Sequence, residues 1–501
     1  MHQHRSYHLP QYSSKCPQPP IVADFYKLAK MAGLNYDNTE KINPKSRSLS
    51  DTEYTWCRAV SSGTGNTVLA LQIADRSPSE IASLHKTIHE LQISHPLLRS
   101  KLHFDPSRKE YSFHIPSSPH VQINFHDYSS TSQIIRTLKT HQNSGISDFH
   151  LIFEHELNNN RWVDPYSFPC NGIEVFFSSV YMLSETKAMV VLKLHAVVCD
   201  RTTGVSFLRA MMEESREAGG VEKGIMNYGE GDLGIESLVP NGTGKKTIWA
   251  RGKTMFGYSL NSLRLTNLEF VNAKKPRFSE VVRLHLSSED TTRIIDGCKS
   301  RRIKLCGALA AAGLIAAHST EFQYDQLKKK YGVVTLVDCR CSLEPALSTH
   351  HFGFYQSAIL DVQTVKGNEN FWDLAQSIYS NFADHKKCNK HLTDLSDINY
   401  LMCKAMENPS LTSSSSLRTS FISVFEDPVF DDSGKLKQDL GVECYMGCAS
   451  AHGVGPSVAI FDTIRDGELD CACVYPSPLH SRAQMNELVD RMRRVLIEES
   501  D

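Results

Sequence analysis

The sequence has no long apolar run. No stretch of its 501 residues approaches the roughly 18–20 apolar residues of a membrane span, and its first twenty residues lack the apolar core of a secretory signal. Charge is also balanced: the sequence has 54 Lys and Arg and 56 Asp and Glu, and its net charge is −2. It therefore lacks the excess of positive charge that is typical of a protein that binds nucleic acid. These absences predict a cytoplasmic, monomeric protein that acts on small or neutral partners.

Several chemical signatures are missing as well. No G-x-G-x-x-G or Walker pattern occurs among the glycines and alanines of 305–317, and no G-x-S-x-G elbow is present, which disfavours a nucleotide-binding protein and a serine hydrolase. The 14 cysteines are scattered through apolar segments, as expected for reduced thiols in packing positions. The C-x-C pairs Cys339/Cys341 and Cys471/Cys473 lack histidines at ligand spacing, so we predict no metal site and no tightly bound cofactor.

The segment at 190–212, VVLKLHAVVCDRTTGVSFLRAMM, is the most informative part of the chain. An apolar strand from Val190 ends at His195, Asp200 follows five positions on, and an amphipathic helix then begins, with Thr202 or Thr203 as its cap. His195 and Asp200 therefore lie where a strand opens into a loop, a usual position for catalytic groups.

This segment resembles the H-H-x-x-x-D-G signature of condensation domains and the related H-x-x-x-D signature of CoA-dependent acyltransferases. Aligning Asp200 with the motif aspartate places His195 on the first histidine, Ala196 on the second and Arg201 on the glycine. In that family the second histidine is the general base. The resemblance makes His195 the first choice for a displaced base, and the alternative is a histidine that serves only the structure.

Two further segments carry the resemblance. His95 to Arg99, HPLLR, looks like the H-P-x-L-R element after the first helix of condensation domains, and we expect it to be structural. The segment from Asp338 through Arg340 to Phe352 and Gly353 resembles the D-x-R-x-R-x-x-P segment and Y-F-G-N turn of the superfamily. The first arginine of that element commonly pairs with the motif aspartate, so Arg340 is the predicted partner of Asp200, and both support the site rather than react.

The resemblance covers roughly residues 53–498 and implies an α/β fold of two chloramphenicol-acetyltransferase-like subdomains, with mixed sheets flanked by helices and an active-site tunnel between them. We predict a flexible extension at 1–50, one subdomain at 51–218, a glycine-rich linker or crossover at 219–253 and a second subdomain at 254–501. His452, in a glycine-rich loop, and Phe352 with Gly353 are further candidates for the pocket lining.

Two functions follow from these observations. The first is an acyltransferase that moves an acyl group from a CoA-type thioester to a hydroxyl or amine of a small metabolite, with His195 as the base and acyl-CoA as co-substrate. The second is a binding or scaffold protein that keeps the acyltransferase fold without the activity, which the alanine at position 196 favours. The direction of the His195 side chain distinguishes them, because a base must face the cavity that holds the substrate.

Overall fold

Residues 43–501 form one compact unit in the computed structural model. The structure describes residues 45–74, 78–141, 145–217, 233–243, 246–247, 249, 251–252, 255, 265–319 and 328–498. Most of the extension predicted at 1–50 and most of the linker predicted at 219–253 lie outside these residues. Among those described, no helix combines the length and the apolar character needed to cross a bilayer.

Four strands of the first half of the chain and one of the second build a mixed sheet in the order β14-β2-β8-β7-β5. Its strands are β2 (Thr64–Ile73), β5 (Ile123–His126), β7 (Phe176–Met182), β8 (Ala188–His195) and β14 (Val442–Ala451). A smaller sheet has the order β1-β4-β3-β6 and shares a hydrophobic core with the larger one. It comprises β1 (Lys45–Ser48), β3 (Lys101–Asp105), β4 (Glu110–Ile115) and β6 (Ile173–Glu174). Both faces of the larger sheet are covered, so β8 is buried along its whole length and β2 along its first eight residues, polar residues included.

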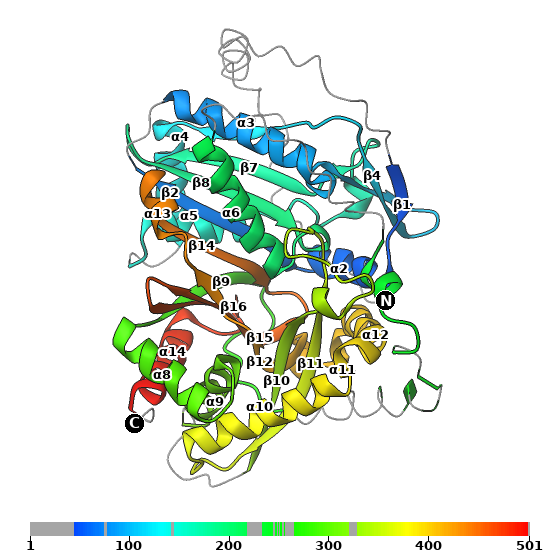
Figure 1. The fold of residues 1–501 in the computed structure, drawn as a ribbon, viewed down its shortest axis with the longest axis vertical. Coiled ribbons are helices and arrows are strands. Elements are labelled where there is room, and N and C mark those ends of the chain that lie inside the picture. Colours follow the sequence, from blue (N-terminus) through cyan, green and yellow to red (C-terminus); the bar gives the residue numbers. More distant parts are fainter. Residues whose placement is uncertain are drawn as a thin grey trace, which may run out of the picture. The chain divides into compact units, whose positions relative to one another are not determined.

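Helices α3 (Pro78–Ser94) and α6 (Arg201–Glu217) run side by side over one face of this sheet (Figure 1). They pack on Val190, Leu192 and Leu194 of β8. Helix α5 (Asp148–Asn158) covers the opposite face, where it packs on Met189 and Val191. Side chains of a strand alternate between the two faces, so this division fixes the face that every residue of β8 presents.

The second half builds a mixed sheet in the order β11-β10-β12-β15-β16-β9, with β13 beside β15. Its strands are β9 (Phe278–Leu286), β10 (Lys329–Asp338), β11 (Gln356–Val365), β12 (Arg418–Phe425), β13 (Val429–Asp431), β15 (Gly455–Arg465) and β16 (Glu468–Ser477). Strands β10, β12 and β15 are parallel neighbours, so their carboxyl ends meet at one edge of the sheet. An edge of this kind is a common place for ligands in α/β proteins.

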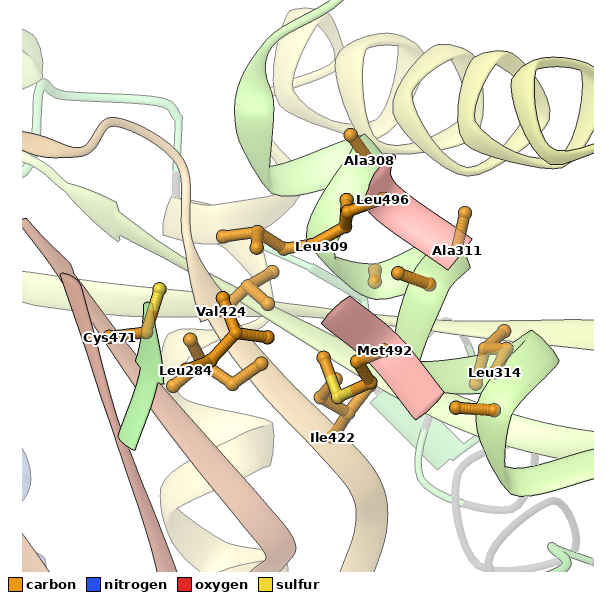
Figure 2. Packing of buried hydrophobic residues seen from close by; sticks show 14 of the residues in the cluster. Leu284, Ala308, Leu309, Ala311, Leu314, Ile422, Val424, Cys471, Met492 and Leu496 are labelled. Atoms are coloured by element: carbon orange, nitrogen blue, oxygen red, sulfur yellow. The ribbon is translucent and has the colours of Figure 1, made fainter. Parts of the chain in front are cut away.

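Helix α9 (Leu305–Ser319) is apolar around nearly its whole circumference, as expected of a helix enclosed by its neighbours. It packs between α10 (Phe371–Lys387) and α14 (Arg482–Glu498), and a Cβ on Gly307 would come 2.9 Å from the Ala375 carbonyl oxygen. Figure 2 shows Leu309 of α9 near Leu496 of α14, and Met492 of α14 near Ile422 of the sheet. The remaining helices are α2 (Asp51–Ser61), α4 (Tyr128–His141), α8 (Ser288–Ser300), α11 (Lys390–Thr393), α12 (Leu395–Glu407) and α13 (Gly434–Asp439).

The predicted α/β fold with mixed sheets and flanking helices is confirmed, but its halves are not separate in the chain. Strand β14 comes from the second half and pairs antiparallel with β2 of the first. The packed chain also begins earlier than position 51, because β1 pairs with β4 and Ser50 caps α2. Within the predicted linker, Ile235 and Leu238 are buried, and Glu236 accepts a hydrogen bond from the backbone of Thr52. This part of the crossover is therefore packed.

Candidate functional site

A cavity of about 190 Å³ lies where the two larger sheets meet. From the first half, β2 contributes Leu69 and Leu71, and α6 contributes Gly204, Val205 and Leu208. From the second half come side chains at the strand ends (Leu336, Phe425, Phe461 and Thr463) and Tyr445 of β14. The wall is mostly apolar and enclosed on several sides, so it suits a small apolar group of a ligand.

Ala196 lines this cavity and His195 does not. Successive side chains of β8 point to opposite faces of the sheet. Leu192 and Leu194 face α6, so Lys193 and His195 point to the face covered by α5. The His195 ring lies edge-on to Trp162, which follows α5, at 5.0 Å between ring centroids. The position aligned with the family base thus faces the cavity but carries a methyl group, while the imidazole next to it points to the other side of the sheet.

The surroundings of His195 are those of a packed side chain. It is 1% exposed, and its Nδ1 accepts a hydrogen bond from the Val197 backbone N–H at 3.1 Å. Burial lowers the pKa of His195 to about 3, so the ring is neutral at physiological pH. A catalytic role for His195 stays a prediction from the sequence, and its placement favours the structural alternative.

Asp200 and Arg340 form the ion pair expected from the sequence. Arg340 donates from Nη1 to Oδ2 of Asp200 at 2.9 Å and from Nη2 to Oδ1 at 3.1 Å, a two-point contact between fully buried groups. Asp200 also accepts hydrogen bonds from the backbone N–H groups of Thr203 and Tyr355, each at 2.8 Å. The pair therefore joins the start of α6, where Asp200 lines the cavity, to the segment after β10.

Asp200 also caps α6, in place of Thr202 or Thr203. Its side chain accepts from the Thr203 N–H, as an N-cap does, whereas the Thr203 hydroxyl donates to the carbonyl of Gly353 at 3.0 Å. The Thr202 hydroxyl donates to Asp338 at 2.8 Å. Both threonines thus join the two halves of the chain, and one carboxylate serves both the helix end and the ion pair.

The other predicted lining residues have different surroundings. Phe352 stacks on His95 at 3.6 Å between ring centroids, in the core under α3, and Gly353 uses its backbone to hold Thr203. His452 shares a hydrogen bond with Ser279 at 3.0 Å, and burial lowers its pKa to about 4. None of the three is among the cavity-lining residues described above, and Phe354, two positions after Phe352, lines the cavity instead.

The HPLLR element is held by its arginine. Arg99 donates from Nη1 to the Gln92 carbonyl at 2.6 Å and from Nε to the Pro116 carbonyl at 2.9 Å, which ties the end of α3 to the segment after β4. These contacts agree with the expected structural role.

Arg201, aligned with the motif glycine, occupies one side of the cavity. Its guanidinium lies 4.0 Å from the ring centroid of Phe425 and pairs with Asp462 at 2.8 Å. Burial raises the pKa of Asp462, and Arg201 opposes that effect. A glycine would leave this volume open, so Arg201 narrows the cavity beside the helix start.

Two parts of the cavity wall contain no residue that the sequence analysis singled out. Trp56 of α2 lies against Phe354 at 4.7 Å between ring centroids, and both line the cavity near Ala196. The segment around β13 supplies Val429 and Phe430, and Asp431 holds it by accepting hydrogen bonds from Lys437 at 2.7 Å and Tyr445 at 2.5 Å. An isolated tryptophan and a three-residue strand carry no motif, so only spatial proximity could reveal them.

No protein-family model and no curated protein matches the sequence. Solved structures match over most of its length. One is the EpoB NRPS cyclization-docking bidomain from Sorangium cellulosum, at TM-score 0.64 and 13% identity over 97% of this chain and 93% of that one. Another is the trichothecene 15-O-acetyltransferase TRI3 from Fusarium sporotrichioides, at TM-score 0.63 and 10% identity over 92% and 97%.

A third match is polyketide synthase associated protein 5 from Mycobacterium tuberculosis, at TM-score 0.61 and 15% identity over 91% of this chain and 98% of that one. The chain has the fold of condensation-type domains and of an acetyltransferase. At these identities the likeness establishes the condensation-type fold and leaves the reaction to the residues of the cavity.

Proposed function

We propose that the protein holds the acyl group of a thioester in the apolar cavity and transfers it to an amine of a small acceptor, without a base from the protein. The observation that carries this proposal is Ala196, which faces the cavity at the position of the family base. In the reaction the amine nitrogen forms a bond to the thioester carbonyl carbon, the carbon–sulfur bond breaks, the thiolate leaves, and the surplus ammonium proton passes to water.

Without a base from the protein, an amine is a better acceptor than an alcohol. A hydroxyl group is a weak nucleophile until its proton is removed, and an imidazole within hydrogen-bonding distance usually removes it. The unprotonated fraction of an amine already offers a free lone pair, so orientation beside the thioester is enough for attack. Positioning alone supplies effective concentrations on the order of 10⁵–10⁸ M in well-aligned intramolecular reactions.

Three features support acyl transfer over an unrelated activity. The cavity lies at the carboxyl ends of parallel strands, its wall is apolar, and the Asp200–Arg340 pair holds the helix start rigidly beside it. The fold is also that of an acetyltransferase. Acyl-CoA is the donor that we propose to test first.

The second candidate is ligand binding without turnover. The charged side chains of the cavity wall favour binding without turnover. Each of Asp200, Arg201 and Asp431 is engaged in an ion pair. Ionised groups held in this way are poor acids and bases, and burial further limits access to them. Such a protein would present or sequester the same apolar ligand.

A thiol-release assay separates these functions. Purified protein is incubated with a panel of acyl-CoAs and matched amine and alcohol acceptors, and free thiol is measured beside direct binding of each acyl-CoA. Release with amines but not alcohols supports the proposed transfer, and binding without release supports the second candidate. Release with alcohols that depends on His195 would overturn both.

A further inference from the structure

Rows of residues from two strands and a helix line the apolar cavity between the two larger sheets. On the sheet, Leu69 and Leu71 of β2 pair with Gly447 and Tyr445 of β14, and all four line the cavity. Alternate residues of a strand point to one face, so these two rows share the side of the sheet that α6 covers. The cavity therefore follows the direction of the strands.

Helix α6 supplies the third row. Gly204, Leu208 and Met212 are spaced by four residues, lie on one side of the helix and all line the cavity. A Cβ on Gly204 would lie 3.5 Å from Cδ2 of Leu69, so this row begins over the middle of β2. Eight residues of α-helix span about 12 Å. The cavity is thus longer than an acetyl group.

Ala196 lies at one end of these rows. A Cβ on Gly65, near the start of β2, would come 2.9 Å from the Cβ of Ala196. Leu208 and Met212 lie further along α6 from its start beside Asp200. An acyl group whose carbonyl carbon is beside Ala196 therefore extends its chain along α6 toward Met212.

The apolar wall ends at a polar rim. Arg209, Asp431 and Asp432 line the cavity there, and Arg209 pairs with Asp432. Burial raises the pKa of Asp431, but hydrogen bonds from Lys437 and its neighbours outweigh that effect and lower the pKa to about 2, so the carboxylate is ionised. Charged groups hold their water strongly, and a methylene that reaches them gains less than one enclosed by leucines.

The volume limits the size of the group that fits. The cavity measures about 190 Å³, and an apolar cavity of about 150 Å³ holds benzene. An acetyl group would leave most of the space unfilled, and a dodecanoyl chain would extend beyond the rim. Each methylene that moves from water into apolar surroundings raises affinity by a factor of about four.

We propose that the cavity selects a straight-chain acyl group of hexanoyl to octanoyl size over acetyl and dodecanoyl groups. This inference rests on the proposed function, because it takes the acyl thioester as the ligand. Gly204 leaves room for the chain beside Leu69, and Met212 closes the far end of the helix row.

Binding of acetyl-, hexanoyl-, octanoyl- and dodecanoyl-CoA to the whole chain tests the selection, with Kd measured by calorimetry. Hexanoyl-CoA should bind at least about a hundredfold more tightly than acetyl-CoA, because it adds four methylenes to the apolar contact. Dodecanoyl-CoA should bind no more tightly than octanoyl-CoA. Equal affinity for acetyl- and hexanoyl-CoA would overturn the inference, as would an affinity that still rises from octanoyl to dodecanoyl.

Two variants should move the preferred length in opposite directions. Gly204→Ala adds a methyl group at ordinary contact distance from Leu69 and favours the helix, so the fold is kept, and octanoyl-CoA should bind at least about tenfold more weakly with acetyl-CoA unchanged. Met212→Ala should raise the affinity for dodecanoyl-CoA at least about tenfold per folded molecule, with the folded fraction taken from circular dichroism.

Gly252→Ala is the matched control, because Gly252 is exposed and a Cβ there would meet nothing within 4 Å. It should keep the chain-length profile of the wild type, and a wild-type profile in Gly204→Ala or Met212→Ala would overturn the inference. Thiol release is measured with the same thioesters and an amine. Length-selective binding without release supports the inference and refutes the transfer, whereas release that does not depend on chain length supports the transfer and refutes the inference.

Discussion

The Asp200–Arg340 pair should be one of the most stabilising contacts in the chain. Asp200→Ala would leave the Arg340 guanidinium, 3% exposed, without its main carboxylate, and the backbone N–H groups of Thr203 and Tyr355 without their acceptor. Breaking a buried pair costs about 3–5 kcal/mol. Leaving the two backbone N–H groups without an acceptor costs about 1–3 kcal/mol each, which sums to a loss of similar size.

Neighbouring groups refine this expectation. Asp338 lies 3.1 Å from Nη1 of Arg340 but is 35% exposed, so it retains only part of the charge compensation. Asp200→Asn should also destabilise the protein, because each carboxylate oxygen accepts from Arg340 and from one backbone N–H. Whichever way the amide is turned, its NH₂ group meets two donors.

Urea unfolding followed by tryptophan fluorescence and circular dichroism measures the loss. The control is Asp432→Ala, which removes the partner of Arg209 in a pair with 46% and 74% exposed side chains and should cost about 0–1 kcal/mol. A loss below about 1 kcal/mol for Asp200→Ala, equal to that of the control, would refute the structural role assigned to the pair.

Three further predictions concern the strand end. His195→Ala should lower the free energy of unfolding by about 2–4 kcal/mol, because it removes the ring that packs against Trp162. The same change should leave the thiol-release rate per folded molecule unchanged, and a rate lower by orders of magnitude at full stability would contradict this. Ala196→His should extend acyl transfer to alcohols, measured as thiol release, because it returns an imidazole to the cavity; wild-type activity with alcohols would contradict the reasoning. Acid should destabilise the protein: the folded-state pKa of His195 is about 3 and the unfolded value about 6.5, so below pH 6.5 the unfolded chain binds a proton that the native state does not. Lowering the pH from 7 to 5 should cost about 2 kcal/mol from this residue, and urea midpoints at both pH values should show a smaller loss in His195→Phe, whereas equal losses would contradict the assignment.

Local sequence patterns were enough to predict the strand and helix around the site and the chemistry of their motif residues. Apolar runs and periodicity located β8 and the start of α6 to within a few residues, because both are local properties of the sequence. The motif residues also fixed the partnership of Asp200 with Arg340, since a buried carboxylate needs a cation and the planar guanidinium matches it.

Tertiary structure decided which residues face the cavity. His195 and Ala196 are neighbours in sequence, and only the packing of α5 and α6 on opposite faces of the sheet shows which of the two reaches the ligand. Trp56 and Phe430 have no local signature, because their surroundings in the cavity wall come from segments far apart in the chain. Strand β14 is the clearest case, since its place beside β2 depends on long-range pairing that no window of sequence contains.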